Sequence, residues 1–540
     1  MSLKYKYYFG CFINTGVLSL SIVFLCFSLL KAQAQDRPNI LFAISDDQSF
    51  PHASAYGTDW VQTPAFDRVA DKGILFTRAY VPNPKCAPSR SIILTGRNSW
   101  QLEEAANHWP DFPEKFKVFT EVLEEEGYFV GSTGKGWAPG IAQTADGSPR
   151  HLAGTPYNEI TMQPPTSAIN SNDYAANFEF FLESRENEDQ PFSFWYGGHE
   201  PHRRYVYSSG VQIGGKEINQ IKEIPSFWPD TDSIRVDMLD YAMEIEYFDE
   251  HLGRMLAHLE EIGELDNTVV VVTADNGMPF PRIKGQLYEQ SAHLPLAIMW
   301  PNGIESPGRV VDDFISFADF APTFIELADL EWKDTGMHST VGKSLTDILF
   351  SDREGQVNEE RDHVILGKER HDVGRPYDWG YPVRGIVKGD FLYLRNFEED
   401  RWPVGNPETG YLNTDGSPTK SFILDHRTTA GMYHYWQWNF GKRPFEELYN
   451  ISQDPNCLHN LADDPAYSDQ KNHLAEDLYR KLKEQNDPRV MGRGYVFEAF
   501  PYMDRGTQNF YQRFMNGEEM NTGWVNDSDF ETEPLPEQSQ

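Results

Sequence analysis

Three short apolar runs in this sequence stop abruptly at polar clusters, and this pattern constrains the fold more than any other feature. Their length and their content of β-branched and aromatic residues predict buried strands. Because helical patterns alternate with them, we expect an α/β fold with a mostly parallel sheet and helices on both faces. Such folds bind ligands at the carboxyl ends of their strands. The runs are residues 38–44 before Asp46 and Asp47, 192–196 before His199 and His202, and 268–273 before Asp275 and Asn276.

The rest of the chain suggests two folded parts. Apolar residues at helical spacing predict a long helix over 233–263 and shorter ones over 63–73 and 118–126. From about residue 360 the pattern changes to shorter strands, at 385–387 and 391–394, followed by a helix over 469–485. We therefore expect a catalytic α/β domain at 35–360, a smaller C-terminal α+β subdomain at 361–514 and an acidic flexible tail at 515–540.

Residues 1–34 have the three parts of a secretory signal peptide. Lys4 and Lys6 precede an apolar core at 17–30, and Ala32-Gln33-Ala34 supplies small residues for cleavage near Ala34. No later stretch is long and apolar enough to suggest a membrane span. The sequence therefore predicts an exported protein, periplasmic or secreted.

Charge and cysteine content narrow the chemistry further. The formal net charge is −35, which argues against nucleic-acid binding because phosphate neutralisation needs clustered Lys and Arg. An anionic substrate would need a local basic pocket set against this overall charge. Two of the four cysteines lie in the predicted signal, and Cys86 and Cys457 are too few for a disulfide framework.

Cys86 begins a distinctive stretch. Pro88, Ser89 and Arg90 follow it, ahead of an apolar run that ends at Gly96, so a potential nucleophile lies at a loop-to-helix junction. The free N–H groups of a first helical turn favour an anion there. A single cysteine in this setting is more often structural, so its meaning depends on the residues around it.

Two further groups of polar residues fall at the same predicted sheet edge. Asp46, Asp47, Asp275 and Asn276 offer only oxygen ligands, which suit Ca²⁺ or Mg²⁺ rather than zinc. The second group would hold an oxyanion. Its members are Arg90, Lys135, His202 and Lys284.

Together these motifs resemble the type I sulfatase family over about residues 37–465. The signature Cys-x-Pro-Ser-Arg begins at Cys86, and the other motifs occur in the order and spacing of that family. They are Pro38-Asn39-Ile40 with Asp46-Asp47, Gly134-Lys135, Pro201-His202, Thr273-Ala274-Asp275-Asn276-Gly277, Glu447-Leu448-Tyr449-Asn450, Asp454-Pro455 and Asn460-Leu461.

Within that family the chain is similar to the branch that contains heparan N-sulfatase and related bacterial polysaccharide sulfatases. This finer resemblance rests on residues 275–281, 199–203 and 381–384. It implies an alkaline-phosphatase-like sulfatase fold.

The resemblance also implies roles for individual residues. Cys86 would be oxidised to formylglycine (3-oxoalanine) by a maturase, and its hydrate would attack sulfur. One Ca²⁺ per chain would be held by Asp46, Asp47, Cys86, Asp275 and Asn276. Arg90 would orient the formylglycine, Lys135 and Lys284 would bind sulfate oxygens, and His202 would be the general acid for the leaving group.

One position departs from the family pattern. Many relatives have a histidine two residues after the lysine that corresponds to Lys135, whereas this chain has Trp137. Either another base, with His108 and His151 as candidates, triggers sulfate release, or turnover is altered.

For the substrate, the loop at 368–375 supplies candidates. Arg370, His371 and Arg375 would read sugar hydroxyls and a neighbouring carboxylate, although an ordinary charged loop is an equal alternative.

We expect a carbohydrate sulfatase of polysaccharide degradation that acts on O-sulfated oligosaccharides, for example from ulvan. The alternatives are an N-sulfoglucosamine sulfohydrolase, a phosphatase or phosphonate monoester hydrolase of the same fold, and a glycan-binding protein with an inactive site.

Overall fold

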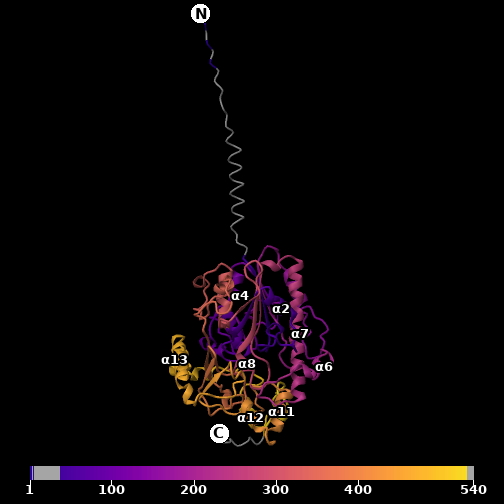
Figure 1. Cartoon of the computed structure of the whole chain (residues 1–540), viewed down its shortest axis with the longest axis vertical. Coiled ribbons are helices and arrows are strands. Elements are labelled where there is room, and N and C mark those ends of the chain that lie inside the picture. Colours follow the sequence, from indigo (N-terminus) through magenta and orange to yellow (C-terminus); the bar gives the residue numbers. More distant parts are fainter. Residues whose placement is uncertain (3, 5, 7–36, 532–540) are drawn as a thin grey trace. The chain divides into compact units, whose positions relative to one another are not determined.

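The larger of two β-sheets organises the computed structural model, which describes residues 1, 2, 4, 6 and 37–531 (Figure 1). Its strand order is β4-β3-β5-β1-β6-β7-β2-β8, with β9 paired to β2. The pairings are parallel except where β7 meets β6 and β2, so the sheet is mostly parallel, as predicted. The strands are β1 (Asn39–Ser45), β2 (Ile74–Tyr80), β3 (Phe129–Gly134), β4 (Thr155–Pro156), β5 (Phe192–Gly197), β6 (Thr268–Ala274), β7 (His293–Met299), β8 (Arg309–Val311) and β9 (Ile315–Ser316).

Helices cover both faces of this sheet. Alternate side chains of β1 point to opposite faces, so Phe42 packs into one core and Leu41 into the other. Helices α3 (Cys86–Thr95), α4 (Phe119–Glu125) and α9 (Phe320–Leu327) line the Phe42 side. The Leu41 side is covered by α2 (Pro64–Asp71), α5 (Tyr174–Glu183) and the long α7 (Asp232–Glu261).

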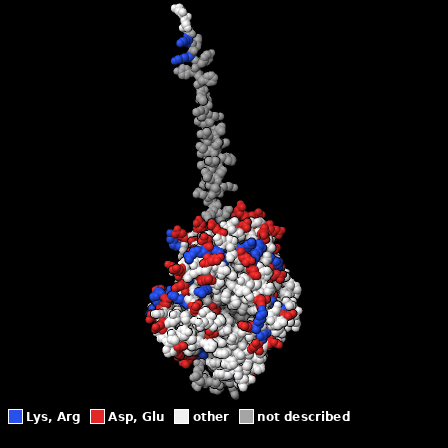
Figure 2. All heavy atoms as spheres, viewed as in Figure 1, with Lys and Arg blue, Asp and Glu red and all other residues white. Residues whose placement is uncertain are grey.

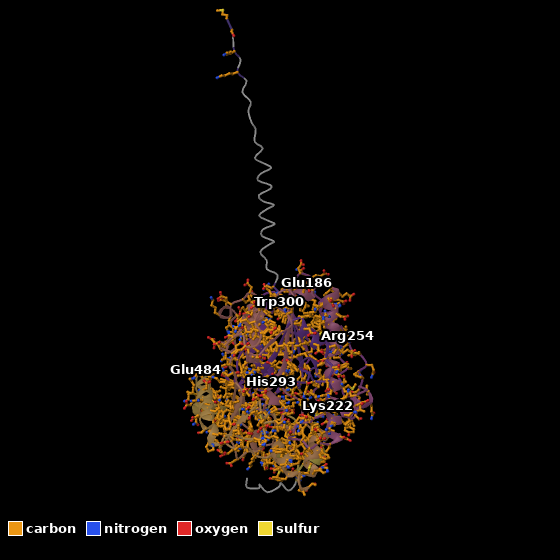
Figure 3. The ribbon with its side chains drawn as sticks, viewed as in Figure 1. Glu186, Lys222, Arg254, His293, Trp300 and Glu484 are labelled. Atoms are coloured by element: carbon orange, nitrogen blue, oxygen red, sulfur yellow. The ribbon has the colours of Figure 1, made fainter. Side chains whose placement is uncertain are left out.

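The predicted α/β class is therefore confirmed, and its elements begin and end close to where the sequence placed them. The long predicted helix is α7, and the three apolar runs are β1, β5 and β6. Arg254 of α7 pairs with Asp173, which caps α5, at 2.8 Å between Nη1 and Oδ1 (Figure 3 labels Arg254). This ion pair joins two helices on the same face of the sheet.

A second, antiparallel sheet follows. Its order is β10 (His363–Lys368), β11 (Val383–Lys388), β12 (Phe391–Asn396) and β13 (Glu446–Asn450). One face packs against α13 (Ser468–Glu484), and the other packs against side chains such as Tyr80 and Tyr288 of the first part. The other α-helices among the described residues are α6 (Ser209–Gln212), α8 (Glu289–Ala292), α10 (Thr346–Leu349), α11 (Pro418–His426), α12 (Tyr433–Phe440), α14 (Tyr495–Ala499) and α15 (Phe510–Met515).

The C-terminal segment folds back onto the loop at 405–416, which the sequence did not predict. Trp524 donates from Nε1 to the carbonyl of Leu412 at 3.0 Å, and its own carbonyl accepts from the Gly416 N–H at 2.6 Å. Val525 is buried beside Leu412 and Phe510. This segment belongs to the predicted flexible tail at 515–540, of which residues 532–540 lie outside the described residues, as does almost all of the predicted signal peptide.

Charges of both signs are spread over the surface. Figure 2 shows Asp and Glu side chains across the viewed face of the folded body, with Lys and Arg interspersed among them. The chain carries 82 acidic and 47 basic residues. Cations that bind an anion must therefore be set apart from this surface, inside a cleft.

A buried ion-pair network fixes the second sheet, and it yields a first prediction. Arg384 of β11 donates from Nε and Nη2 to Asp487 at 2.7 and 3.0 Å, and from Nη2 to Glu369 at 2.7 Å. Arg384 and Asp487 are both 0% exposed. We expect Asp487→Ala to lower the free energy of unfolding by about 3–5 kcal/mol, because it leaves a buried charge without its main partner.

Chemical denaturation of the variant measures this loss. Asp59→Ala is the control, because Asp59 pairs with Lys222 at an exposed position and its removal should leave the unfolding midpoint unchanged. Equal shifts in the two variants would contradict the prediction.

Candidate active site

Cys86 is the first residue of α3, and the helix start fixes its side chain. Lys85 is the extended N-cap residue, and Gly96 ends the helix in a left-handed conformation. Every residue of α3 is buried, and Cys86 is 1% exposed. Its Sγ donates to Asp46 Oδ1 at 3.4 Å. The cysteine of the signature therefore lies against the acids that follow β1.

Strand register brings the two acid pairs together. β1 and β6 pair in parallel with Ser45 opposite Ala274, so the residues after each strand emerge side by side. Ligand atoms of Asp46, Asp47, Cys86 and Asp275 lie within 4.8 Å of one another. The Asp47 N–H donates to Asp275 Oδ1 at 3.1 Å, which closes the cluster.

Two groups of the cluster, the Asp275 carboxyl and the Asn276 side-chain oxygen, have the features expected of a cation site. Burial, and then the charge of Asp46, raise the pKa of the Asp275 carboxyl to about 7. Asn276 donates from Nδ2 to Asp47 and Asp275, whereas its buried Oδ1 has no partner among the described residues. Three carboxylates and a free amide oxygen are the donors that Ca²⁺ or Mg²⁺ prefers. The donor set thus fits a hard divalent cation.

Arg90 supports this cluster from α3. Its Nε donates to Asp275 Oδ2 at 2.9 Å, and its Nη1 donates to the carbonyls of Lys135 and Gly136 at 2.5 and 2.7 Å. Arg90 is 0% exposed. Its guanidinium therefore ties α3 to the acid pair after β6 and to the loop after β3.

Two lysines form ion pairs with the acids on the side of the cluster that faces the cleft. Lys135 Nζ lies 2.5 Å from Asp46 Oδ2. Lys284 Nζ lies 2.6 Å from Asp47 Oδ2 and 2.8 Å from Asp415 Oδ2. Although burial opposes it, the charge of Lys135 above all keeps the pKa of Asp46 well below its usual value. The lysines stay charged because each has a buried carboxylate partner.

His202 completes the group of predicted cations. Its Nε2 lies 3.0 Å from Lys284 Nζ, and its Nδ1 lies 2.6 Å from the carbonyl of Arg203. Its side chain is 36% exposed. Since a charged lysine donates, Nε2 accepts here and Nδ1 carries the ring proton. The structure thus brings together all nine residues predicted for catalysis and metal binding.

A cleft of about 510 Å³ opens above this cluster. Cys86, Asp46, Lys135, His202 and Lys284 line its floor, and Asp47, Arg90, Asp275 and Asn276 lie behind them. The walls come from segments far apart in the chain. They include Lys85, His108, Trp109, His199, Arg204, Glu244, Asp372, Asp415, Tyr502, Asp504 and Trp524.

The three residues predicted to read the sugar do not reach this cleft. Arg370 donates to the carbonyls of Phe500 and Pro501, and Arg375 donates to the carbonyls of Trp402 and Pro403. His371 lies between the carbonyl of Gly285 and Asn83 Oδ1. Each is at most 3% exposed. Their polar groups hold the loop in place, and only its Asp372 lines the cleft.

Trp137 does not line the cleft. Its Nε1 donates to Ser91 Oγ at 2.8 Å, and its ring packs edge-on against Phe112. Of the two candidate replacement bases, His151 is exposed outside the cleft lining, whereas His108 lies in it. His108 Nδ1 lies 2.8 Å from Asp372 Oδ1, and burial lowers the pKa of this histidine to about 4. His108 is therefore a neutral ring oriented by a carboxylate.

Several residues at the cleft were not identified from the sequence. Asp415 lies in Asn413-Thr414-Asp415-Gly416, a composition that indicates only a turn. Glu244 lies within an ordinary helical pattern, and Trp524 lies in a segment with few apolar residues. No local signal separates these residues from their neighbours, because only the tertiary fold brings them to the cleft.

Curated relatives match most of the chain. Human N-sulphoglucosamine sulphohydrolase is 26% identical over 504 residues, which cover 87% of this chain and 95% of the relative. An ulvan-active sulfatase from Formosa agariphila is 26% identical over 88% of this chain and 89% of its own length. Both matches therefore cover most of the two chains compared.

Solved structures share the fold. A 2-O GAG sulfatase superposes with a TM-score of 0.60 at 18% identity, over 84% of this chain and 94% of that one. A protein solved in complex with its substrate D-glucosamine-2-N,6-O-disulfate gives a TM-score of 0.57 at 21% identity, over 84% and 98%. At these identities the likeness concerns the fold.

The family model named Sulfatase matches residues 38–330, more than half of the chain. That span holds β1 to β9 and every residue of the acid cluster and its cations. Members of this family hydrolyse sulfuric esters. The chain belongs to the sulfatase family.

Proposed function

We propose that this sulfatase removes sulfate from a sulfated carbohydrate, with formylglycine formed from Cys86 and with Ca²⁺ held by the acid cluster. The observation that supports it most is the single cluster of Asp46, Asp47, Cys86 and Asp275 within 4.8 Å, flanked by Lys135 and Lys284. Relatives named for N-sulfoglucosamine, ulvan and N-acetylglucosamine-6-O-sulfate support a carbohydrate substrate.

An unmodified cysteine suits this position poorly. Burial, and then the charge of Asp46, raise the pKa of the Cys86 thiol well above its usual value. A protonated thiol is a weak nucleophile. A hydrated aldehyde at the same position would supply a hydroxyl nucleophile and a second hydroxyl through which sulfate leaves.

The cations bind and orient the sulfate. Lys135 and Lys284 each present N–H donors at the cleft floor, and Ca²⁺ would act as a Lewis acid on a sulfate oxygen. Arg90 keeps the Cys86 side chain and Asp275 in fixed positions. The sulfate is therefore neutralised locally, in a chain whose overall charge would repel it.

His202 is positioned to protonate the leaving group. It accepts from Lys284 at Nε2 while Nδ1–H donates to the Arg203 carbonyl, so it must gain a proton before it can donate one. The imidazolium then keeps its Nδ1–H hydrogen bond to the Arg203 carbonyl and donates its Nε2 proton to the leaving oxygen or nitrogen. His108, oriented by Asp372, is the base we assign to the position that Trp137 leaves unfilled.

We infer that the substrate is an O-sulfated oligosaccharide and that the protein is exported through the predicted signal peptide. Among the described residues, no helix has the length and apolarity needed to cross a bilayer. The second candidate is N-sulfoglucosamine, which the name of the human relative favours. A desulfation panel of N-sulfoglucosamine, N-acetylglucosamine 6-sulfate and ulvan fragments separates the two, since release from N-sulfoglucosamine alone would establish the second.

Calcium should stabilise the protein through the acid cluster. We expect the unfolding midpoint of chelator-treated protein to rise on adding CaCl₂, by the equivalent of about 2.7 kcal/mol when the ion exceeds its Kd 100-fold. Asp47→Ala and Asn276→Ala should lose this rise, because each removes a ligand. Asp504→Ala, which changes a cleft acid outside the cluster, should keep it. Differential scanning calorimetry measures the midpoint, and no rise in wild type would refute the site.

Cys86 should be converted to formylglycine and should be required for sulfatase activity. Intact-mass measurement after co-expression with a maturase should show Cys86 losing a thiol and gaining an aldehyde. Cys86→Ala should lower kcat at least about a thousandfold on any sulfate ester that wild type cleaves. Cys457→Ala changes the second buried free cysteine of residues 37–531 and should keep both the mass change and the activity. Full activity of Cys86→Ala would exclude this nucleophile, and faster turnover of aryl phosphate than of aryl sulfate would contradict the reaction.

A further inference from the structure

One face of α7 carries three buried acids, and they differ in what satisfies them. Asp237 accepts from both Nη atoms of Arg203 at 2.7 and 2.8 Å. Asp240 accepts from the backbone N–H groups of Ser208 and Gly210, each at 2.8 Å. Glu244, one turn further along, is 2% exposed and has no hydrogen-bond or ion-pair partner within residues 37–531.

Glu244 is also the member of this row that lines the cleft. A carboxyl that faces a cleft and has no partner within the protein has lost most of its water, and only the remaining water or a ligand can satisfy it. The two acids nearer the start of α7 do find partners, in Arg203, Ser208 and Gly210. An unsatisfied polar group at the wall of a cleft is therefore a candidate ligand-binding residue.

The surroundings define what Glu244 can bind. Burial, and then the charge of Glu200, raise the pKa of the Glu244 carboxyl well above its usual value, although Arg203 opposes this. A neutral carboxyl both donates and accepts hydrogen bonds. Arg203 is already occupied by Asp237, so it offers no free charge for an anion. This wall therefore suits a neutral polar group and disfavours a carboxylate or a second sulfate.

We propose that Glu244 binds a hydroxyl group of the sugar that carries the sulfate and thereby selects for carbohydrate over simple aryl sulfates. The proposal rests on the proposed function, since it concerns the sugar bound in that cleft. It assigns specificity to α7, outside the 368–375 loop that the sequence suggested.

Glu244→Leu tests the proposal through two independent measurements. We expect its unfolding midpoint to rise, because the variant buries an apolar side chain in place of an unpaired carboxyl. We expect kcat/KM on the best-cleaved sugar of N-sulfoglucosamine, N-acetylglucosamine 6-sulfate and ulvan fragments to fall about 10- to 100-fold, mainly through KM. The fall on 4-nitrophenyl sulfate, which has no sugar hydroxyl, should be much smaller.

Matched variants of α7 serve as controls. Asp240→Leu should lower the midpoint, because it removes the acceptor for two backbone N–H groups. Glu250→Gln changes an exposed acid of the same helix and should alter neither the midpoint nor the kinetics. Glu244→Gln keeps a neutral donor and acceptor and should retain sugar turnover within about threefold of wild type.

The outcomes separate this inference from the function it rests on. A lower midpoint in Glu244→Leu, or equal losses on sugar and aryl sulfate, overturns the role of Glu244. A Glu244→Gln variant as impaired as Glu244→Leu overturns the neutral hydrogen bond. If wild type cleaves 4-nitrophenyl sulfate but none of the three sugars, the carbohydrate function itself is refuted.

Discussion

The parallel pairing of β1 with β6 is the constraint on which the site depends. With Ser45 opposite Ala274, the backbone delivers Asp46 and Asp47 next to Asp275 and Asn276. A slip of one residue would turn every side chain of a strand to the other face of the sheet. Packing into the two apolar cores supports the register, because Phe42 packs into one of them and Leu41 into the other. The geometry of the acid cluster is thus specified by hydrophobic packing behind it.

Concentrating three carboxylates in a buried cluster would be unfavourable without compensation. Arg90, Lys135 and Lys284 each contact one of these acids, and each comes from a different element. Lys284 is shared with Asp415 from the C-terminal part, so the second half of the chain also contributes to the charge balance. Of these cations, Lys135 and Lys284 also face the cleft, where a sulfate would take over part of their charge.

Local patterns were enough to predict the floor of the cleft. Strand ends, a helix start and short motifs carry the acids, Cys86 and the cations, and the rules of parallel sheets place strand ends together. No comparable rule predicts which residues form the walls of the cleft. Asp372 and Asp415 lie in irregular loops, Glu244 lies in the middle of a regular helix, and Trp524 arrives from the C-terminal segment.

Charge alone misidentified the loop at 368–375. Arg370 and Arg375 looked available for a ligand, but backbone carbonyls of neighbouring loops take up their N–H groups. Sequence shows how many donors a side chain has, whereas only the fold shows which are already used.

The return of the C-terminal segment to the 405–416 loop affects the order in which the cleft can form. Asp46 and Asp47, which follow β1, are synthesised early, and Trp524 is synthesised almost last. The Trp524 carbonyl nevertheless accepts from the Gly416 N–H, directly beside Asp415. At about 5–20 residues per second, a ribosome needs roughly 25 to 95 seconds to pass from Asp47 to Trp524. Throughout that time the cleft lacks the part of its wall that Trp524 contributes.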